Sequence, residues 1–365
     1  MRSVKFGLSI LVSLFSLGGC GEPDPVRIGF IGGLEGRASD IGIASRNAVQ
    51  LGVDEVNTAG GINGRKVELY VRDDGGTAEG GAEAARALVG EKVDAIIGPN
   101  LSVVASGMVP VINEAGIVSI SPTVSSLAFV GKDDYFYRIG STTRQYATAY
   151  ADFCEKAGIK RMAMTLDKRN AVFSESWLAE FRAAHEARGG EVIAAVSFDA
   201  TVSGDFARVT REILETRPDA LLFIANGVDS AQFAQQVRKL DPDIPFFAAE
   251  WAASESLFEL GGRAIEGLIL LQTYDRYDDR ARYVSFRDAY RDRFQEDPGF
   301  SSVAAYDGLT ALLAALRSGN ENLKEAMDSV GSVEGLQQIV EFDAFGDSER
   351  RRVFVEARDG KFIRK

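Results

Sequence analysis

The sequence predicts an α/β fold made of two doubly wound, Rossmann-like lobes. From residue 26 onward, short apolar runs alternate with amphipathic stretches of helical period, which is typical of βαβ units around a parallel sheet. The same alternation starts again after Arg138, so two similar halves follow each other along the chain. The length of 365 residues and the hydrophobic fraction of 45% suit a globular protein of about two domains.

The first half starts with an apolar run at residues 26–31 that ends at two glycines. The stretch that follows places Ala44, Ala48 and Leu51 on one face of a helix. The pattern then repeats, with strands expected at 67–71, 93–97 and 117–120 and helices at about 79–89 and 103–115.

The second half repeats this order of elements. Gly189-Gly190 and Arg217-Pro218 are typical stops between a helix and the next strand. Periodicity does not assign a last block, with a strand near 268–271 and helices near 281–294 and 302–316, to either half. The second half itself has expected strands at 160–166, 191–197, 220–224 and 245–249, and helices near 174–188, 205–216 and 230–240.

The N-terminus has the pattern of an export signal. Arg2 and Lys5 precede an apolar stretch at residues 6–17, which is shorter than the ~20 residues that span a bilayer. The following Leu17-Gly18-Gly19-Cys20 resembles the lipobox of bacterial lipoproteins. This resemblance implies that residues 1–19 are a lipoprotein signal peptide, that Cys20 is lipidated, and that 20–25 form a tether. We therefore expect an exported, membrane-anchored protein, and the alternative is an ordinary secretory signal with a chance cysteine.

Composition excludes several classes of function. A net charge of −12 makes nucleic acid an improbable partner, because phosphate backbones repel an acidic chain. One histidine and two cysteines leave little for a metal site or a histidine-based triad, and the glycines at 29–36 have the wrong spacing for a dinucleotide fingerprint. We expect no catalytic residues, no metal and no cofactor, with His185 on a solvated helix surface and Cys154 in the core.

Two loops are predicted to form a binding site. Residues 98–102 follow a strand and precede a helix whose N-cap is expected to be Ser102, and the hydroxyl-rich residues 121–126 follow the next strand. The carboxyl ends of parallel strands meet at one edge of a sheet, where ligands bind. The free N–H groups of the helix would attract a small anion such as a carboxylate, although the hydroxyls could also serve only as caps.

Several segments resemble one known family. Residues 26–30 and 59–69, Asp73-Asp74, residues 97–99 with 121–122, and residues 306–309 are similar to leucine/isoleucine/valine-binding proteins. These are the type I solute receptors (type I periplasmic binding proteins) of ABC importers. The resemblance implies two lobes joined by a three-strand hinge, no enzymatic activity, and a permease and ATPase subunits as partners. It divides the chain into 26–140 plus 270–337 for lobe 1 and 141–269 plus 338–365 for lobe 2.

The resemblance also implies the binding residues. Ser102 and Ser125 would hold the carboxylate of an L-amino acid, with backbone contacts from Thr123, while Glu250 would pair with its ammonium group. The remaining contacts would come from Leu101, Phe173, Asn226 and Trp251.

By the same resemblance, Phe173 stands where the family often carries a tyrosine, and a second aromatic of the leucine-type pocket is lost around Asn226, so the ligand side chain stays open. The alternatives are an aromatic or aliphatic carboxylic acid or amide on the same scaffold, or a ligand-sensing subunit for a signalling partner.

Overall fold

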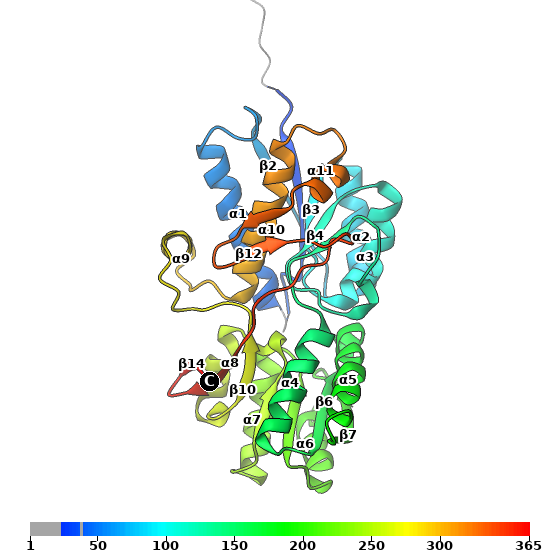
Figure 1. Cartoon of the computed structure of the whole chain (residues 1–365), viewed down its shortest axis with the longest axis vertical. Coiled ribbons are helices and arrows are strands. Elements are labelled where there is room, and N and C mark those ends of the chain that lie inside the picture. Colours follow the sequence, from blue (N-terminus) through cyan, green and yellow to red (C-terminus); the bar gives the residue numbers. More distant parts are fainter. Residues whose placement is uncertain (1–22, 37–38) are drawn as a thin grey trace, which may run out of the picture.

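The computed structural model describes residues 23–36 and 39–365 and confirms an α/β fold of two lobes (Figure 1). The predicted signal peptide and lipidation site at residues 1–20 lie outside the described residues. No helix within the described ranges is long and apolar enough to cross a membrane.

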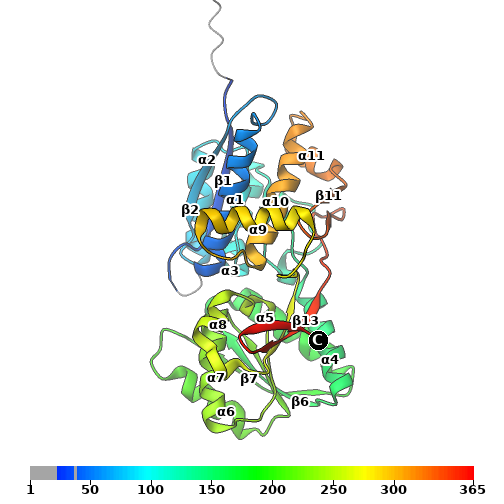
Figure 2. The same cartoon turned by 90° about the vertical axis from the view of Figure 1, so that its left-hand side faces the viewer.

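The first lobe is built on a five-stranded parallel sheet with the strand order β2-β1-β3-β4-β5. Helices α1 and α10 cover one face of this sheet, while α2 and α3 cover the other. Figure 2 shows α9 lying across the first lobe in front of α1 and α10. The elements are β1 (Val26–Gly32), α1 (Ser39–Thr58), β2 (Val67–Asp73), α2 (Ala78–Gly90), β3 (Ala95–Ile97), α3 (Ser102–Ala115), β4 (Ser119–Ser121), η1 (Leu127–Phe129), β5 (Phe136–Arg138), α9 (Ala281–Phe294), α10 (Phe300–Arg317), α11 (Leu323–Ser329), β11 (Ser332–Glu334) and β12 (Ile339–Glu341).

The second lobe contains a seven-stranded sheet with the order β14-β13-β10-β9-β8-β6-β7. The strands β6 to β10 pair in parallel, whereas β13 and β14 are antiparallel additions at the edge. The elements are α4 (Thr143–Ala157), β6 (Arg161–Asp167), η2 (Lys168–Asn170), α5 (Ala171–Glu186), β7 (Glu191–Phe198), α6 (Asp205–Glu215), β8 (Ala220–Ile224), α7 (Gly227–Leu240), β9 (Phe246–Ala248), η3 (Glu250–Ala252), α8 (Glu255–Gly261), η4 (Gly262–Ile265), β10 (Ile269–Gln272), β13 (Val353–Arg358) and β14 (Lys361–Arg364).

The parallel strands of the two sheets are arranged in the same order. In each lobe the parallel strands follow the order second, first, third, fourth, fifth along the chain, so the direction of winding reverses beside the first strand. Ligands of such sheets bind at this reversal, outside the carboxyl ends of the strands. The repeat predicted from the alternation of elements is therefore a repeat of topology, and it places a comparable loop cluster in each lobe.

The chain crosses between the lobes three times, and two crossings differ from the predicted boundaries. Residues 270–272 belong to β10 in the second sheet rather than to the first lobe. The segment after residue 338 stays with the first lobe, because Val340 lies in its core and Phe342 packs on Tyr137 with ring centroids 5.4 Å apart. Asp347 still pairs with Arg138 of β5, so the last crossing comes at about residues 349–352. The strands in this part of the chain are too short to give a periodic pattern in the sequence, so the position of the last crossing could not be predicted from it.

The single histidine was placed wrongly by the sequence. His185 is 1% exposed, stacks on Phe181 with ring centroids 5.0 Å apart, and its Nε2 contacts the Lys160 carbonyl at 3.0 Å. Burial lowers the pKa of this imidazole below its ordinary value. Cys154 is buried in the core, as predicted.

Candidate functional site

The candidate site lies where the carboxyl ends of both parallel sheets face each other. The first lobe contributes the loops after β3 and β4, and the second lobe contributes the segments after β6 and β9. Direct hydrogen bonds join these loops across the lobes, among them Ser126 Oγ to the Val172 carbonyl at 2.8 Å. The structure therefore shows the lobes closed onto each other.

The loop after β3 depends on a glycine. Gly98 has φ of +122°, and a Cβ on it would lie 2.0 Å from the Ile31 carbonyl oxygen. Asn100 continues the loop by donating from Nδ2 to Ser45 Oγ at 2.9 Å. Its carbonyl accepts the hydroxyl of Thr123 at 2.7 Å, so the two loops of the first lobe are held together.

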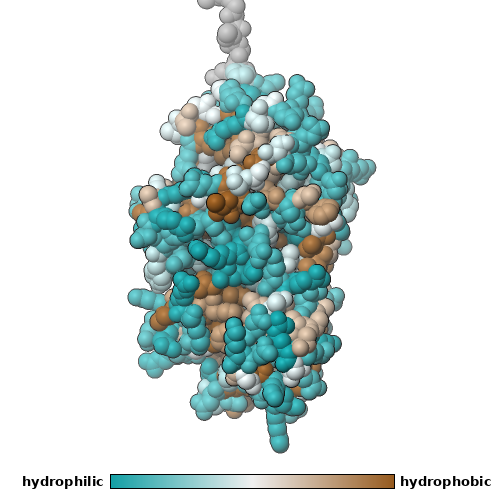
Figure 3. Space-filling model, in the orientation of Figure 1, coloured by the Kyte–Doolittle hydropathy of each residue, from teal (hydrophilic) through white to brown (hydrophobic). Residues whose placement is uncertain are grey.

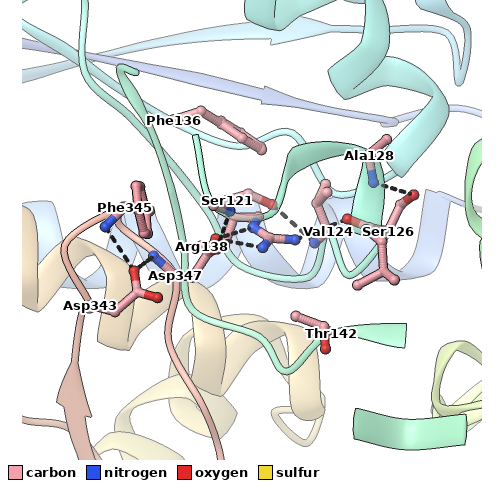
Figure 4. A network of polar contacts seen from close by, with 12 residues as sticks. Ser121, Val124, Ser126, Ala128, Phe136, Arg138, Thr142, Asp343, Phe345 and Asp347 are labelled. Atoms are coloured by element: carbon pink, nitrogen blue, oxygen red, sulfur yellow. Dashed lines mark hydrogen bonds and ion pairs between the residues drawn. The ribbon is translucent and has the colours of Figure 1, made fainter. Parts of the chain in front are cut away.

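A buried arginine fixes the shape of the loop after β4 (Figure 4). Arg138 is 1% exposed, donates from Nη1 to the Ser126 carbonyl at 3.1 Å, and forms an ion pair with Asp347 at 2.5 Å. Ser121 Oγ accepts the N–H of Val124 at 3.0 Å inside the same loop. Removing one partner of a buried ion pair typically costs about 3–5 kcal/mol, so the loop that carries Thr123 and Ser125 is rigidly supported.

Ser102 does not cap the helix as predicted. It is the first residue of α3, while Leu101 holds the N-cap position without a side-chain cap bond. The hydroxyl of Ser102 makes no hydrogen bond with any residue that the structure describes, although the side chain is 2% exposed. The N–H of the next residue, Val103, is bound by Asn170 Oδ1 of the second lobe at 3.0 Å. One first-turn N–H of α3 is thus used for closure, and the Ser102 hydroxyl remains available.

Glu250 is a buried carboxylate at the meeting point of the lobes. Its two oxygens accept Trp177 Nε1 at 2.9 Å and the Ser125 hydroxyl at 3.2 Å, and its side chain lies at the start of η3. Burial raises the pKa of Glu250 to about 7, and the hydrogen bonds from Trp177 and Ser125 offset only part of that effect. The carboxylate is therefore balanced between its protonated and ionised forms near neutral pH.

A cavity of about 590 Å³ lies beside this contact, between the lobes. Leu101 and Trp251 line it, and the Trp251 ring packs edge-to-face against Phe173 with centroids 5.7 Å apart. Trp251 is 6% exposed, and its Nε1 has no hydrogen-bond partner among the described residues. An apolar wall with a free indole donor is suited to a ligand that has both apolar surface and a hydrogen-bond acceptor.

A charged cluster in the second lobe was not expected. Arg169, which lines the cavity, forms ion pairs with both Asp167 and Asp229. Burial raises the pKa of Asp167 even though Arg169 acts in the opposite direction. Asn226 caps α7 and donates to Asp229 at 2.8 Å. Asn226 is therefore placed behind Arg169. Of the predicted binding residues only Leu101 and Trp251 line the cavity, and the others lie outside its lining: Ser102, Thr123, Ser125, Phe173, Asn226 and Glu250.

The structure brings together most of the predicted residues. Ser125 contacts Glu250, Phe173 contacts Trp251, and Leu101 lines the cavity with Trp251, whereas the Thr123 hydroxyl is bonded within its own lobe. Trp177 and residues 167–170 were missed. The polar run after β6 and the helical spacing between Phe173 and Trp177 were the signals that could have identified them.

Comparison with known proteins agrees with this geometry. The model of a family described as periplasmic binding protein matches residues 25–361. The chain belongs to this family. It is a type I periplasmic binding protein of the leucine/isoleucine/valine-binding group, and its relatives are substrate-binding proteins of ABC transporters rather than enzymes. Membership places the protein outside the cytoplasm.

Three similar proteins illustrate the range of the family. A Leu/Ile/Val-binding protein BraC3 of Rhizobium johnstonii is 28% identical over 254 residues, which cover 68% of each chain. The LivJ substrate-binding protein of Streptococcus pneumoniae, solved with isoleucine, has a TM-score of 0.85 at 22% identity and covers 94% of this chain and 100% of its own. A solute-binding protein of R. palustris, solved with benzoate, has a TM-score of 0.84 at 21% identity and covers 93% and 95%.

No group of three or more His, Cys, Asp or Glu side chains that could hold a metal ion occurs in the described part of the chain.

Proposed function

We propose that this periplasmic binding protein captures an amino acid, of the branched-chain type or a related one, between its lobes and delivers it to an ABC permease. The observation that carries the proposal is the contact between Ser125 and Glu250, a hydroxyl of one lobe against a buried carboxylate of the other. An α-amino acid carries one group for each side, and only the closed arrangement offers both.

We assign the binding roles from the groups that each residue has available for a ligand. Ser102, with its unbonded hydroxyl at the first turn of α3, and Ser125 hold the ligand carboxylate together with backbone N–H groups near Thr123. Glu250 accepts the ammonium group, which replaces the Ser125 hydroxyl as its partner. Leu101 and Trp251 provide the apolar wall, and Phe173 packs on Trp251 from behind it. Asn226 supports this wall indirectly, through the Asp229–Arg169 pair.

The lobe assignment and the anchoring are parts of the same proposal. Residues 1–19 are removed as a signal peptide, Cys20 carries the lipid, and 20–25 tether the lobes to the membrane beside the permease and ATPase subunits. The two lobes comprise residues 26–140 with 273–348 and 141–272 with 349–365, a division that follows the observed sheets.

A thermal unfolding screen of the purified full chain against L-amino acids and small carboxylic acids tests the function. A ligand at 100 times its dissociation constant stabilises the native state by about 2.7 kcal/mol, which is visible as a rise in the midpoint. We expect one group of L-amino acids to produce the rise, and Ser102→Ala and Glu250→Gln to abolish it. The controls Ser106→Ala and Glu259→Gln change exposed residues of the same types and keep the response.

A second candidate ligand is a carboxylic acid without an amine. It is favoured by the raised pKa of Glu250, since a protonated carboxyl needs no cationic partner, and the solute-binding protein of R. palustris with the same fold was solved with benzoate. The pH dependence of affinity separates the two candidates. An ammonium group stabilises ionised Glu250, so affinity for an amino acid rises as pH increases through about 7, whereas affinity for an amine-free acid falls. Calorimetry at pH 6 and pH 8 measures the sign.

The alternative to transport is a sensing function, in which the ligand-bound protein binds a signalling partner. Uptake of the identified ligand by cells with and without the protein separates transport from sensing. Loss of uptake supports the importer, and unchanged uptake with a lost cellular response contradicts it.

A further inference from the structure

We infer that the hinge carries a second binding site, which takes a small polyvalent oxyanion such as a phosphate or a tricarboxylate. A cavity of about 330 Å³ lies where the chain returns between the lobes, away from the candidate amino-acid site. Residues 272–280 line one side, Gln337 and Gln338 of the first lobe line another, and residues 351–355 with Arg364 of the second sheet complete it. Its volume is at the lower end of the ~300–1,000 Å³ range of small-molecule pockets.

The walls of this hinge cavity are held by side-chain amides. Gln337 accepts the N–H of Asp275 at 2.8 Å and donates to the Asp275 carbonyl at 2.6 Å. Gln338 donates to the Thr273 carbonyl at 2.6 Å and accepts the N–H of Arg351 at 2.8 Å. Both amides thus join hinge segments that are distant in sequence, so the cavity is a built feature rather than a gap between loops.

The lining is positively charged in an acidic protein. Five arginines face two aspartates around the cavity, Asp275 and Asp278, although the chain as a whole carries a net charge of −12. Arg276, Arg280 and Arg352 are each paired with one carboxylate, from Glu255, Asp278 and Glu349 respectively. The remaining two, Arg351 and Arg364, form no ion pair with any residue that the structure describes.

Figure 3 shows hydrophilic side chains over most of this face of the molecule, with apolar side chains in separate smaller patches.

Two buried donors in the wall also lack partners. Gln272 is 4% exposed, and its Nε2 makes no hydrogen bond within the described residues. The same holds for the buried Nε of Arg276. A buried donor without an acceptor lowers the stability of the fold. Because both residues line the cavity, an anion bound there would supply the missing acceptors.

These features select the ligand by its chemistry. Guanidinium groups bind oxyanions through paired N–H donors, and an anion with two or more charges gains from several arginines at once. The apolar members of the lining are Val353, Val355 and Phe362. Because the walls come from both lobes, a bound anion stabilises the closed arrangement over one in which the walls separate.

The test compares inorganic phosphate and citrate with chloride at equal ionic strength, using thermal unfolding and calorimetry on the purified full chain. Phosphate or citrate should raise the unfolding midpoint where chloride does not. The double variant Arg351→Ala/Arg364→Ala should weaken binding by about tenfold or more, because two charge-assisted contacts are lost. The matched control Arg182→Ala/Arg211→Ala removes two exposed arginines of α5 and α6 and should bind as the original chain does.

Four outcomes decide the inference. Equal weakening in both double variants shows a general charge effect and overturns it, as does a response to phosphate no larger than the response to chloride. Retained phosphate binding in Ser102→Ala supports a site separate from the amino-acid site. Loss of phosphate binding in Ser102→Ala would place the anion between the lobes and overturn the hinge site.

Discussion

At the scale of single residues, Glu250 has the most unusual environment. Its pKa of about 7 in the folded chain compares with 4.5 for an ordinary glutamate, so the native state holds a proton that the unfolded chain releases between those values. The stabilising contribution of this proton is complete below about pH 4.5 and is lost as pH rises through about 7. The ionised form therefore lowers stability above pH 7 by about 3 kcal/mol.

Glu250→Gln removes this titration, because an amide keeps the shape of the side chain without a charge. We expect the variant to be more stable than the original chain at pH 8 and nearly equal to it at pH 4.5. Urea unfolding at both pH values, in the absence of ligand, measures the difference. Glu259→Gln, at an exposed position of α8, should show no such pH-dependent gain. An equal gain in both variants would attribute the effect to net charge and not to burial.

The positions of the site residues along the chain could be predicted from the sequence better than their surroundings in the fold. The position of Ser125 and Glu250 at strand ends was predictable, and their contact at 3.2 Å agrees with it. His185 was placed on the wrong face, although Trp177, Phe181 and His185 follow each other at intervals of four on one helix face. The partner of Asn226 was not predictable, since the Arg169 cluster joins two segments of the second lobe that are distant in sequence, one after β6 and one at the start of α7.

At the scale of elements, the central strands and their helices were predicted within a few residues. The strands β5 and β11 to β14 and the helices α4, α8 and α11 were not. The edge strands are short and mostly exposed, so their burial pattern lacks a clear period. Helix α4 begins with a capping box between Thr142 and Gln145, a signal that the sequence contained and that could have identified it.

The pair α2 and α3 depends on glycine. A Cβ on Gly107 of α3 would lie 1.8 Å from the Ala78 carbonyl oxygen, and one on Gly81 would lie 2.6 Å from Val104 Cγ1. Gly107→Ala must therefore push the helices apart, and it should destabilise the chain by about 1–3 kcal/mol. Because α3 begins with Ser102, the shift should also weaken ligand binding.

Urea unfolding of Gly107→Ala beside Gly90→Ala measures this effect. Gly90 ends α2, and a Cβ added there would have no atom within 4 Å, so alanine at this position should be neutral or stabilise by up to about 1 kcal/mol. Equal stability of the two variants would contradict close packing of α2 on α3.

At the scale of the whole molecule, hydrogen bonds between the lobes stabilise the closed arrangement. Asn170 Oδ1 accepts the Val103 N–H at 3.0 Å, and Ser256 Oγ donates to Asp40 Oδ2 at 2.8 Å. At the hinge, Arg350 forms a buried ion pair with Asp307 at 2.6 Å. A ligand that contacts both lobes therefore adds to the stability of a closed arrangement that these bonds already favour.

Asn170→Ala shifts this equilibrium toward the open form, because α3 loses the acceptor for its Val103 N–H while nothing in the hinge changes. We expect a larger radius of gyration for the ligand-free variant in small-angle X-ray scattering, and a return to the compact value when ligand saturates it. Apparent affinity should fall by the same factor as the closed fraction, since binding must first restore closure. Asn320→Ala, at an exposed site of the first lobe, serves as the control and should scatter as the original chain does. A variant that stays compact but binds weakly would show instead that Asn170 contacts the ligand directly and does not control closure.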